Sequence, residues 1–211
     1  AGVLGRRLIE TNKNFQQLQA SLTTFTGSAQ NGARAFQILQ EFASKTPFSV
    51  QEVTSSFNIL IARGIKPTVA ELEAFGDIAA GSGKSFSQLA EAVADAAVGE
   101  FERLKEFGIK AGKENDKVVI SFGGATQKIE NNSASIIKAL TGIAKTGFAG
   151  ATERQAKTLS GAFSNFGDAV VAAAFAIGKQ GLNKEINRVT REFSKLITNN
   201  KQATRQIGSV L

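Results

Sequence analysis

Apolar residues at both ends of the chain recur at alternating spacings of four and three residues, the seam of a helix in a coiled coil. The N-terminal seam includes Leu8, Phe15, Leu18 and Leu22. The C-terminal seam is formed by Leu182, Ile186, Val189, Phe193 and Leu196. Because a helix buries such a stripe against another helix, we expect both seams to join copies of the chain in a helical bundle.

Between the two seams, the apolar spacing predicts a series of short helices separated by breaks. Phe36, Leu39 and Phe42 fit one face of a helix that ends before a proline. Thr68 with Glu71 forms a capping box, which marks the start of another helix. Short helices with frequent breaks fold back on one another, so we expect a compact multi-helix module.

The spacing changes from helical to alternating near residue 117. Val118, Ile120 and Phe122 are separated by single residues, as in a strand with one buried face. Gly123-Gly124 then supplies a two-residue hairpin turn. The sequence therefore predicts a mainly α fold with one small β-hairpin (α+β), at about residues 117–130.

These patterns divide the chain into three parts. Residues 1–32 are an N-terminal amphipathic helix followed by a break, and residues 33–180 are the compact module with the hairpin. Residues 181–211 are a basic amphipathic C-terminal helix. The predicted architecture is thus a compact multi-helix module flanked by amphipathic, heptad-like terminal helices.

Composition removes much of the chemistry that enzymes use. The 211 residues include no Cys, His, Met, Trp or Tyr, so thiol nucleophiles, histidine bases and zinc-finger ligand sets are excluded. Glu102 and Glu106 share a helix face, but Arg103 and Lys105 lie beside them, and solvated helix charge is the expected role. We predict no catalytic residue, no cofactor and no metal ligand, and hence a protein that is not an enzyme.

Gly83-Lys84-Ser85 resembles the end of a phosphate-binding loop, but the rest of that motif is missing. The motif needs a glycine where Ile78 stands, and it follows a buried strand, whereas residues 69–78 have a helical period. We therefore interpret the stretch as a glycine turn. In this interpretation Ser85 caps the next helix with Gln88 as its partner, and Lys84 is solvated.

The net charge of +7 permits a partner that carries negative charge. Beside the C-terminal seam runs a basic stripe that consists of Lys184, Arg188, Arg191 and Lys195. The stripe fits either a solvated helix face or a contact with nucleic acid or anionic lipid. The apolar residues 169–178 are too few to span a bilayer, and we expect a buried helix there. A basic helical protein that acts on membranes or binds nucleic acid is thus the alternative function.

Three blocks in the middle of the chain, in this order, resemble the tape measure domain of tailed-phage tail tape measure proteins. They are "FQILQEFASKTPFSVQEVTSSFNILIARGIKPT" (36–68), "GEFERLKEFGIKAGKENDKVVISFGG" (99–124) and "GFAGATERQAKTLSGAFSNFGDAV" (147–170). The resemblance covers residues 33–178. Three ordered blocks are more specific than any single motif.

The resemblance implies a structural virion protein of the tail lumen or tip, made in the host cytoplasm. Such proteins organise tail tube assembly, set tail length and assist genome delivery. The implied partners are the tail tube, the tail-tip or baseplate hub proteins and, during ejection, the host membrane or phage DNA.

The residues themselves bear on which part of that task the module performs. A ruler needs an extended helix, which rises about 1.5 Å per residue, whereas Pro47, Pro67, many glycines and a hairpin fold this module back on itself. We therefore expect the module to anchor the protein at the tail tip, and the measuring helix to lie elsewhere in a longer chain.

Overall fold

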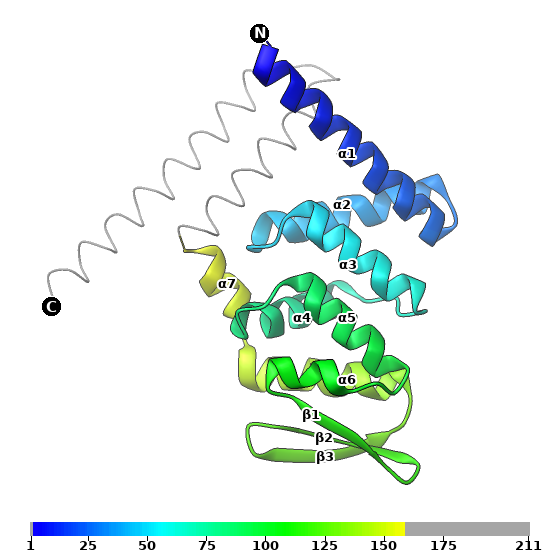
Figure 1. The fold of residues 1–211 in the computed structure, drawn as a ribbon, viewed down its shortest axis with the longest axis vertical. Coiled ribbons are helices and arrows are strands. Elements are labelled where there is room, and N and C mark those ends of the chain that lie inside the picture. The colour runs from blue at the N-terminus through cyan, green and yellow to red at the C-terminus, as the bar shows by residue number, and fades with distance from the viewer. Residues whose placement is uncertain (1, 159–211) are drawn as a thin grey trace, which may run out of the picture. The chain divides into compact units, whose positions relative to one another are not determined.

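A computed structural model describes residues 2–158, with their side chains from residue 14 onward (Figure 1). Its α-helices are α1 (Gly2–Thr26), α2 (Ala29–Lys45), α3 (Val50–Ala62), α4 (Val69–Gly81), α5 (Phe86–Ala97), α6 (Ser133–Ile143) and α7 (Ala151–Ala156). Two short segments have other helical forms: η1 (Glu102–Phe107) is a 3₁₀ turn, tighter than an α-helix, and η2 (Ala144–Phe148) is a π turn, wider than an α-helix. The strands β1 (Lys110–Glu114), β2 (Lys117–Phe122) and β3 (Ala125–Glu130) form one antiparallel sheet. The predicted fold class, mainly α with a small β element, is confirmed.

The chain divides into two compact units, and residues 51–152 form one of them. In the other, residues 2–50 contain the hairpin of α1 and α2. Gly27 (φ +80°) ends α1, and the hydroxyl of Ser28 caps α2 by accepting a hydrogen bond from the Asn31 N–H at 3.1 Å. The rings of Phe15 and Phe36 meet edge to face at 5.3 Å between centroids, so the two helices share an aromatic contact.

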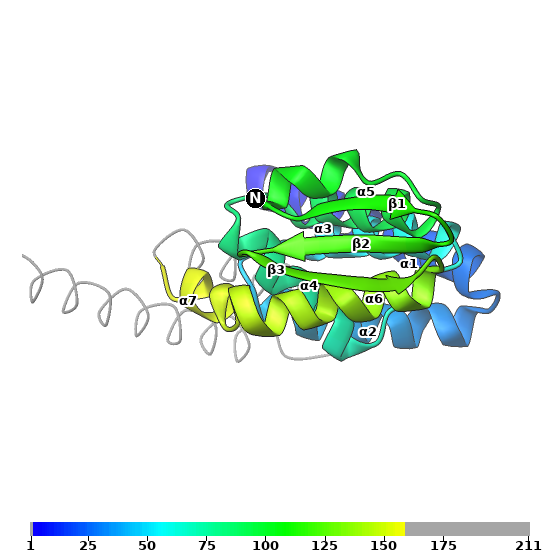
Figure 2. The same cartoon turned by 90° about the horizontal axis from the view of Figure 1, so that it is seen from below.

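The unit of residues 51–152 is built on the helix pair α4–α5. Both helices begin with complete capping boxes, Thr68 with Glu71 and Ser85 with Gln88, as the sequence predicts. In Figure 2 the sheet lies over the helices of this unit, with β3 beside α6. Its core includes the fully buried side chains of Phe75, Ile78, Phe86, Leu89, Leu104, Ile109, Val118, Ile120, Ile136 and Leu140.

The predicted hairpin is present as β2 and β3, joined by Gly123-Gly124. Both glycines have positive φ, +58° and +84°, as a two-residue type I′ turn requires. Val118 and Ile120 are buried while Val119 between them is half-buried, which follows the predicted alternation. The hairpin is thus the predicted one in position and turn, and on its predicted buried face Phe122 is half-buried.

A third strand, β1, extends the predicted hairpin and was not predicted from the sequence. Its sequence, KAGKE, lacks the alternating apolar residues that mark a strand. It is held by antiparallel pairing with β2, from Lys110 opposite Ser121 to Glu114 opposite Lys117. The turn that joins the two strands includes Asn115 at φ +54°, a conformation that asparagine tolerates better than most residues.

Thr54 on α3 has a buried hydroxyl without a hydrogen-bond partner, and a substitution that removes the hydroxyl should stabilise the chain. Its side chain is fully buried, and its Oγ1 has no hydrogen-bond partner. An unsatisfied buried hydroxyl destabilises a protein, so Thr54→Val, which replaces it with a methyl group, is expected to raise the free energy of unfolding by about 1 kcal/mol. Urea denaturation of the full chain followed by far-ultraviolet circular dichroism measures the change.

Ser56 on the same helix provides the control. Its hydroxyl donates to the Glu52 carbonyl at 2.7 Å and lies 3.2 Å from the Ser87 hydroxyl. Ser56→Ala should therefore lower the free energy of unfolding while Thr54→Val raises it. Equal losses in both variants would show that the Thr54 hydroxyl has a partner.

Candidate functional site

The stretch Gly83-Lys84-Ser85 forms the predicted turn between α4 and α5. Gly83 has φ +65°, and the Ser85 hydroxyl accepts from the Gln88 N–H at 3.1 Å. The Gln88 side chain in return accepts from the Ser85 N–H at 3.0 Å. The Lys84 ammonium is not simply solvated, because it lies 3.4 Å from the Glu106 carboxylate, and 35% of its side chain is exposed. This lysine therefore links the turn to η1.

The charged residues of η1 pair with neighbouring charges of opposite sign. Lys105 lies 2.6 Å from the Glu102 carboxylate. The Arg103 guanidinium contacts Glu91, and its Nε lies 3.0 Å from the Asp95 carboxylate one turn further along α5. All these pairs are partly exposed, so each contributes little to stability. The two pairs of Arg103 join η1 to α5, whereas the Lys105–Glu102 pair lies within η1. The predicted surface role of these charges agrees with this geometry.

The N-terminal seam packs on the same chain at Phe15, whose ring meets Phe36 of α2. Leu22 is also buried, and Leu18 is half-buried. The side chain of Leu8, the C-terminal seam, the basic stripe and residues 169–178 lie outside the described residues. Contact of the seams with other copies stays a prediction.

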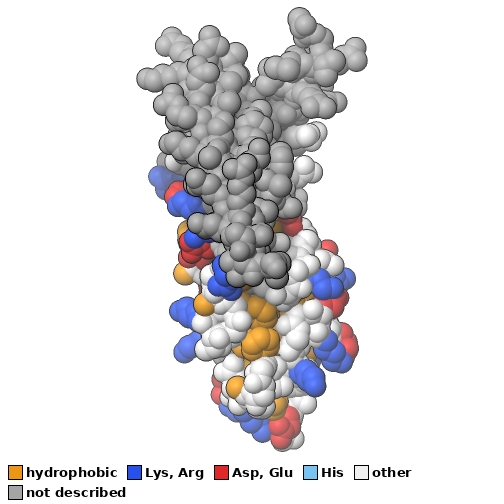
Figure 3. Space-filling view, turned by 90° about the vertical axis from the view of Figure 1, so that its left-hand side faces the viewer, with side chains coloured by type: hydrophobic (Ala, Val, Ile, Leu, Met, Phe, Trp, Pro, Cys, Tyr) orange, Lys and Arg blue, Asp and Glu red, His pale blue; other side chains and the backbone are white. Residues whose placement is uncertain are grey.

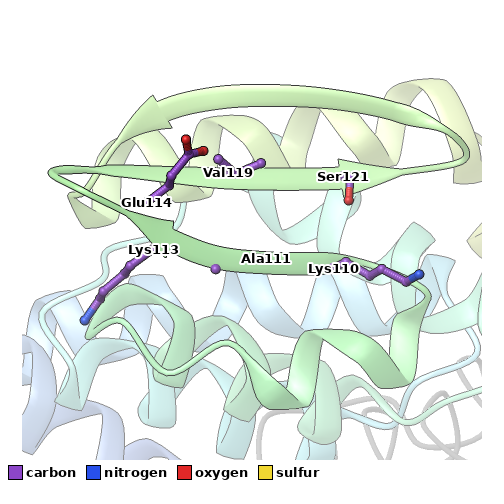
Figure 4. A pocket seen from close by; sticks show the side chains of 7 residues that line it. Lys110, Ala111, Lys113, Glu114, Val119 and Ser121 are labelled. Carbon is purple, nitrogen blue, oxygen red and sulfur yellow. The ribbon is translucent and has the colours of Figure 1, made fainter.

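A shallow hollow of about 300 Å³ lies over β1, an edge strand of the sheet, and the neighbouring β2 (Figure 4). It opens where Gly112 on β1 stands opposite Val119 on β2 and leaves space that a side chain would fill. The exposed Lys110 and Lys113 flank it on β1, and Glu114 is paired with Lys128 at 3.3 Å. Lysines on a short edge strand are typical of edges that resist pairing with other strands. β1 therefore has the features of a protected edge strand.

In the 51–152 unit, two glycines and two phenylalanines pack together where η2 contacts β2 and α4. The rings of Phe122 and Phe148 lie 4.9 Å apart. A Cβ on Gly147 would lie 2.8 Å from Cζ of Phe122, and one on Gly81 would lie 2.5 Å from Cδ1 of Phe148. Only glycine fits at both positions without movement of a ring. We call these four residues the phenylalanine junction.

Asp77 on α4 holds the backbone just beyond the phenylalanine junction. One carboxylate oxygen accepts from the Gly150 N–H and the other from the Thr152 N–H, both at 2.9 Å. Gly150 has φ +70°, and α7 begins at the next residue. The first N–H groups of a helix have no partner within it, so the Asp77 carboxylate acts as the cap of α7. Sequence reasoning missed this cap because its residue is more than seventy positions away.

The positive charge of the chain is unevenly divided. Residues 51–152 carry 11 Lys and Arg against 12 Asp and Glu, whereas the rest of the chain carries 14 against 6. On the face of the described residues shown in Figure 3, basic and acidic side chains are interspersed. The excess that could attract an anionic partner therefore lies outside the 51–152 unit.

Among the side chains of residues 14–158, no group of three or more acidic residues is placed to hold a metal ion. None of the helices in the described range is both long enough and apolar enough to cross a bilayer.

Comparison with known proteins places these features in a family. A family model described as tape measure protein matches residues 6–179, which include the phenylalanine junction and Asp77. The comparisons with curated proteins and with solved structures gave no match.

Proposed function

Because the chain belongs to the tape measure protein family, we propose that residues 51–152 anchor the protein to other proteins of the phage tail. Proteins of this family are structural components of the tail in the virion. The chain is accordingly a phage tail protein. For the whole protein we propose the organisation of tail tube assembly and length, together with help in genome delivery.

The observation that carries the anchoring role is that these residues fold back on themselves. A continuous helix of about 100 residues would extend for about 150 Å. In residues 51–152 the chain instead returns, so that Asp77 binds the N–H groups of Gly150 and Thr152. A segment whose end is bound to one of its own earlier helices adds little length, which supports a docking module and not a ruler.

The charge distribution favours a protein as the docking partner of this unit. Residues 51–152 carry nearly equal numbers of basic and acidic residues. Binding to DNA or anionic lipid is driven by an excess of positive charge, which this unit lacks. Tail-tip, hub or tube proteins are therefore the proposed partners. Contacts with the membrane or with DNA during ejection, and with other copies, are assigned to the remaining residues.

In-frame deletions in the full-length gene test this proposal. Removal of residues 51–152 is expected to abolish tail assembly, because the protein can no longer attach. Deletion of an equally long helical segment elsewhere in the protein should leave tails that are shorter by about 1.5 Å per residue removed. Electron microscopy of lysates measures both the number and the length of tails. Functional tails that are merely shortened by the first deletion would contradict the anchoring role.

A further inference from the structure

We infer that Asp77 is a latch that fixes the point where the chain leaves the 51–152 unit. Its carboxylate holds the backbone at Gly150 and Thr152, and its loss releases η2 and the start of α7 while the rest of the unit stays folded. In the tail, the latch sets the origin from which the following chain extends. That last step rests on the proposed function.

The Asp77 carboxylate binds strongly, and the start of α7, which it binds, is unstable on its own. Hydrogen bonds from N–H groups to a carboxylate are roughly twice as strong as those between neutral groups. Asp77 makes two of them, each at 2.9 Å. The six-residue helix α7 is far below the length at which an isolated helix is stable in water. The start of α7 therefore depends on the Asp77 carboxylate.

The backbone next to Asp77, from η2 to Gly150, has an unusual conformation that needs support. η2 is a five-residue π turn, and Gly150 lies in the left-handed region at φ +70°. Wide helical turns of this kind are rare, and they persist where surrounding contacts hold them. At this place the contacts are the Phe122 ring, which packs on Phe148 at the end of η2, and the carboxylate of Asp77, which binds Gly150 just beyond it.

Asp77 stands on a fixed support. Phe75, two positions before it on α4, and Ile78, directly after it, are fully buried in the core of the unit. The carboxylate itself is half-buried and reaches out from this helix to the exit of the chain. A group on a rigid helix holds a position more accurately than one on a loop, which is what an origin for length measurement needs.

Hydrogen exchange of the full chain tests the latch directly. In Asp77→Ala, exchange at the amides of Gly150 and Thr152 is expected to rise about 10- to 100-fold, the change expected for loss of charge-assisted hydrogen bonds. Asp77→Asn keeps one acceptor oxygen and should give an intermediate rise. Exchange in α4, α5 and the sheet should stay within about twofold of its original rate.

Glu73→Gln is the matched control. Glu73 lies one turn earlier on the same helix, is exposed and has no hydrogen bond or ion pair with any described residue. Its substitution should leave exchange at Gly150 and Thr152 unchanged. The latch is overturned if Asp77→Ala leaves these two amides protected, or if exchange rises equally throughout residues 51–152.

Tail assembly in a complementation experiment separates the latch from the proposed function. Asp77→Ala is expected to yield fewer tails or a broader length distribution than Glu73→Gln. Normal tails despite raised exchange would overturn the role of the latch in setting the origin. Loss of tails without raised exchange would overturn the latch and leave the anchoring function standing.

Discussion

Gly32→Ala is expected to lower the free energy of unfolding of the α1–α2 hairpin by about 2 kcal/mol, as overpacking of a close helix contact typically does. A Cβ on Gly32 would lie 2.8 Å from the backbone N and 2.9 Å from the Cα of Thr23. These are backbone atoms, so no side-chain rotation relieves the collision, and the two helices have to separate. Separation also weakens the contact between Phe15 and Phe36. Urea denaturation of the full chain, followed by far-ultraviolet circular dichroism, measures the loss.

Gly142→Ala is the control for this substitution. Gly142 also lies within a helix, α6, but a Cβ there would meet no atom within 4 Å. Alanine is a better helix former than glycine by about 1 kcal/mol, so Gly142→Ala should stabilise the chain. At Gly32 the higher helix propensity of alanine likewise offsets part of the free energy that the collision costs. If both variants were stabilised, the close approach of α1 and α2 at Thr23 would be disproved.

The features that could be predicted from the sequence are those specified by residues close together in the chain. The capping box of Ser85 and Gln88 needs only three residues of separation. The hairpin at Gly123-Gly124 likewise depends on a turn and its flanking alternation. Both were predicted correctly because their physical cause is local.

The features that could not be predicted depend on partners distant in the chain. β1 is a strand because β2 offers it hydrogen bonds, and its sequence KAGKE gives no sign of this. Asp77 caps α7 from another helix, so no rule based on neighbouring residues identifies it. Heptad spacing at Phe15 predicts a partner helix, but it does not say whether that helix belongs to the same chain. In the structure, α2 of the same chain supplies the contact.

The phenylalanine junction gives a physical reason for two of the sequence blocks that resemble the family. The block at residues 99–124 ends with Phe122-Gly123-Gly124, and the block at 147–170 begins with Gly147-Phe148. The rings of Phe122 and Phe148 pack together, and Gly147 is small because the Phe122 ring lies against it. Two blocks separated in the sequence are thus parts of one contact.

The substitution Gly147→Ala tests that contact and is expected to lower the free energy of unfolding by about 2 kcal/mol. The added Cβ would lie 2.8 Å from Cζ of Phe122 and closer still to Cε1. The half-buried ring of Phe122 can move only by leaving its packing against Phe148.

The double variant with Phe122→Ala removes the obstacle, so Gly147→Ala should become neutral or stabilising in that background. The two substitutions should therefore be coupled by 1 kcal/mol or more, roughly the range for residues in contact. Urea denaturation of the four chains of this cycle measures the coupling, and additive effects would show that Phe122 is not what requires glycine at position 147.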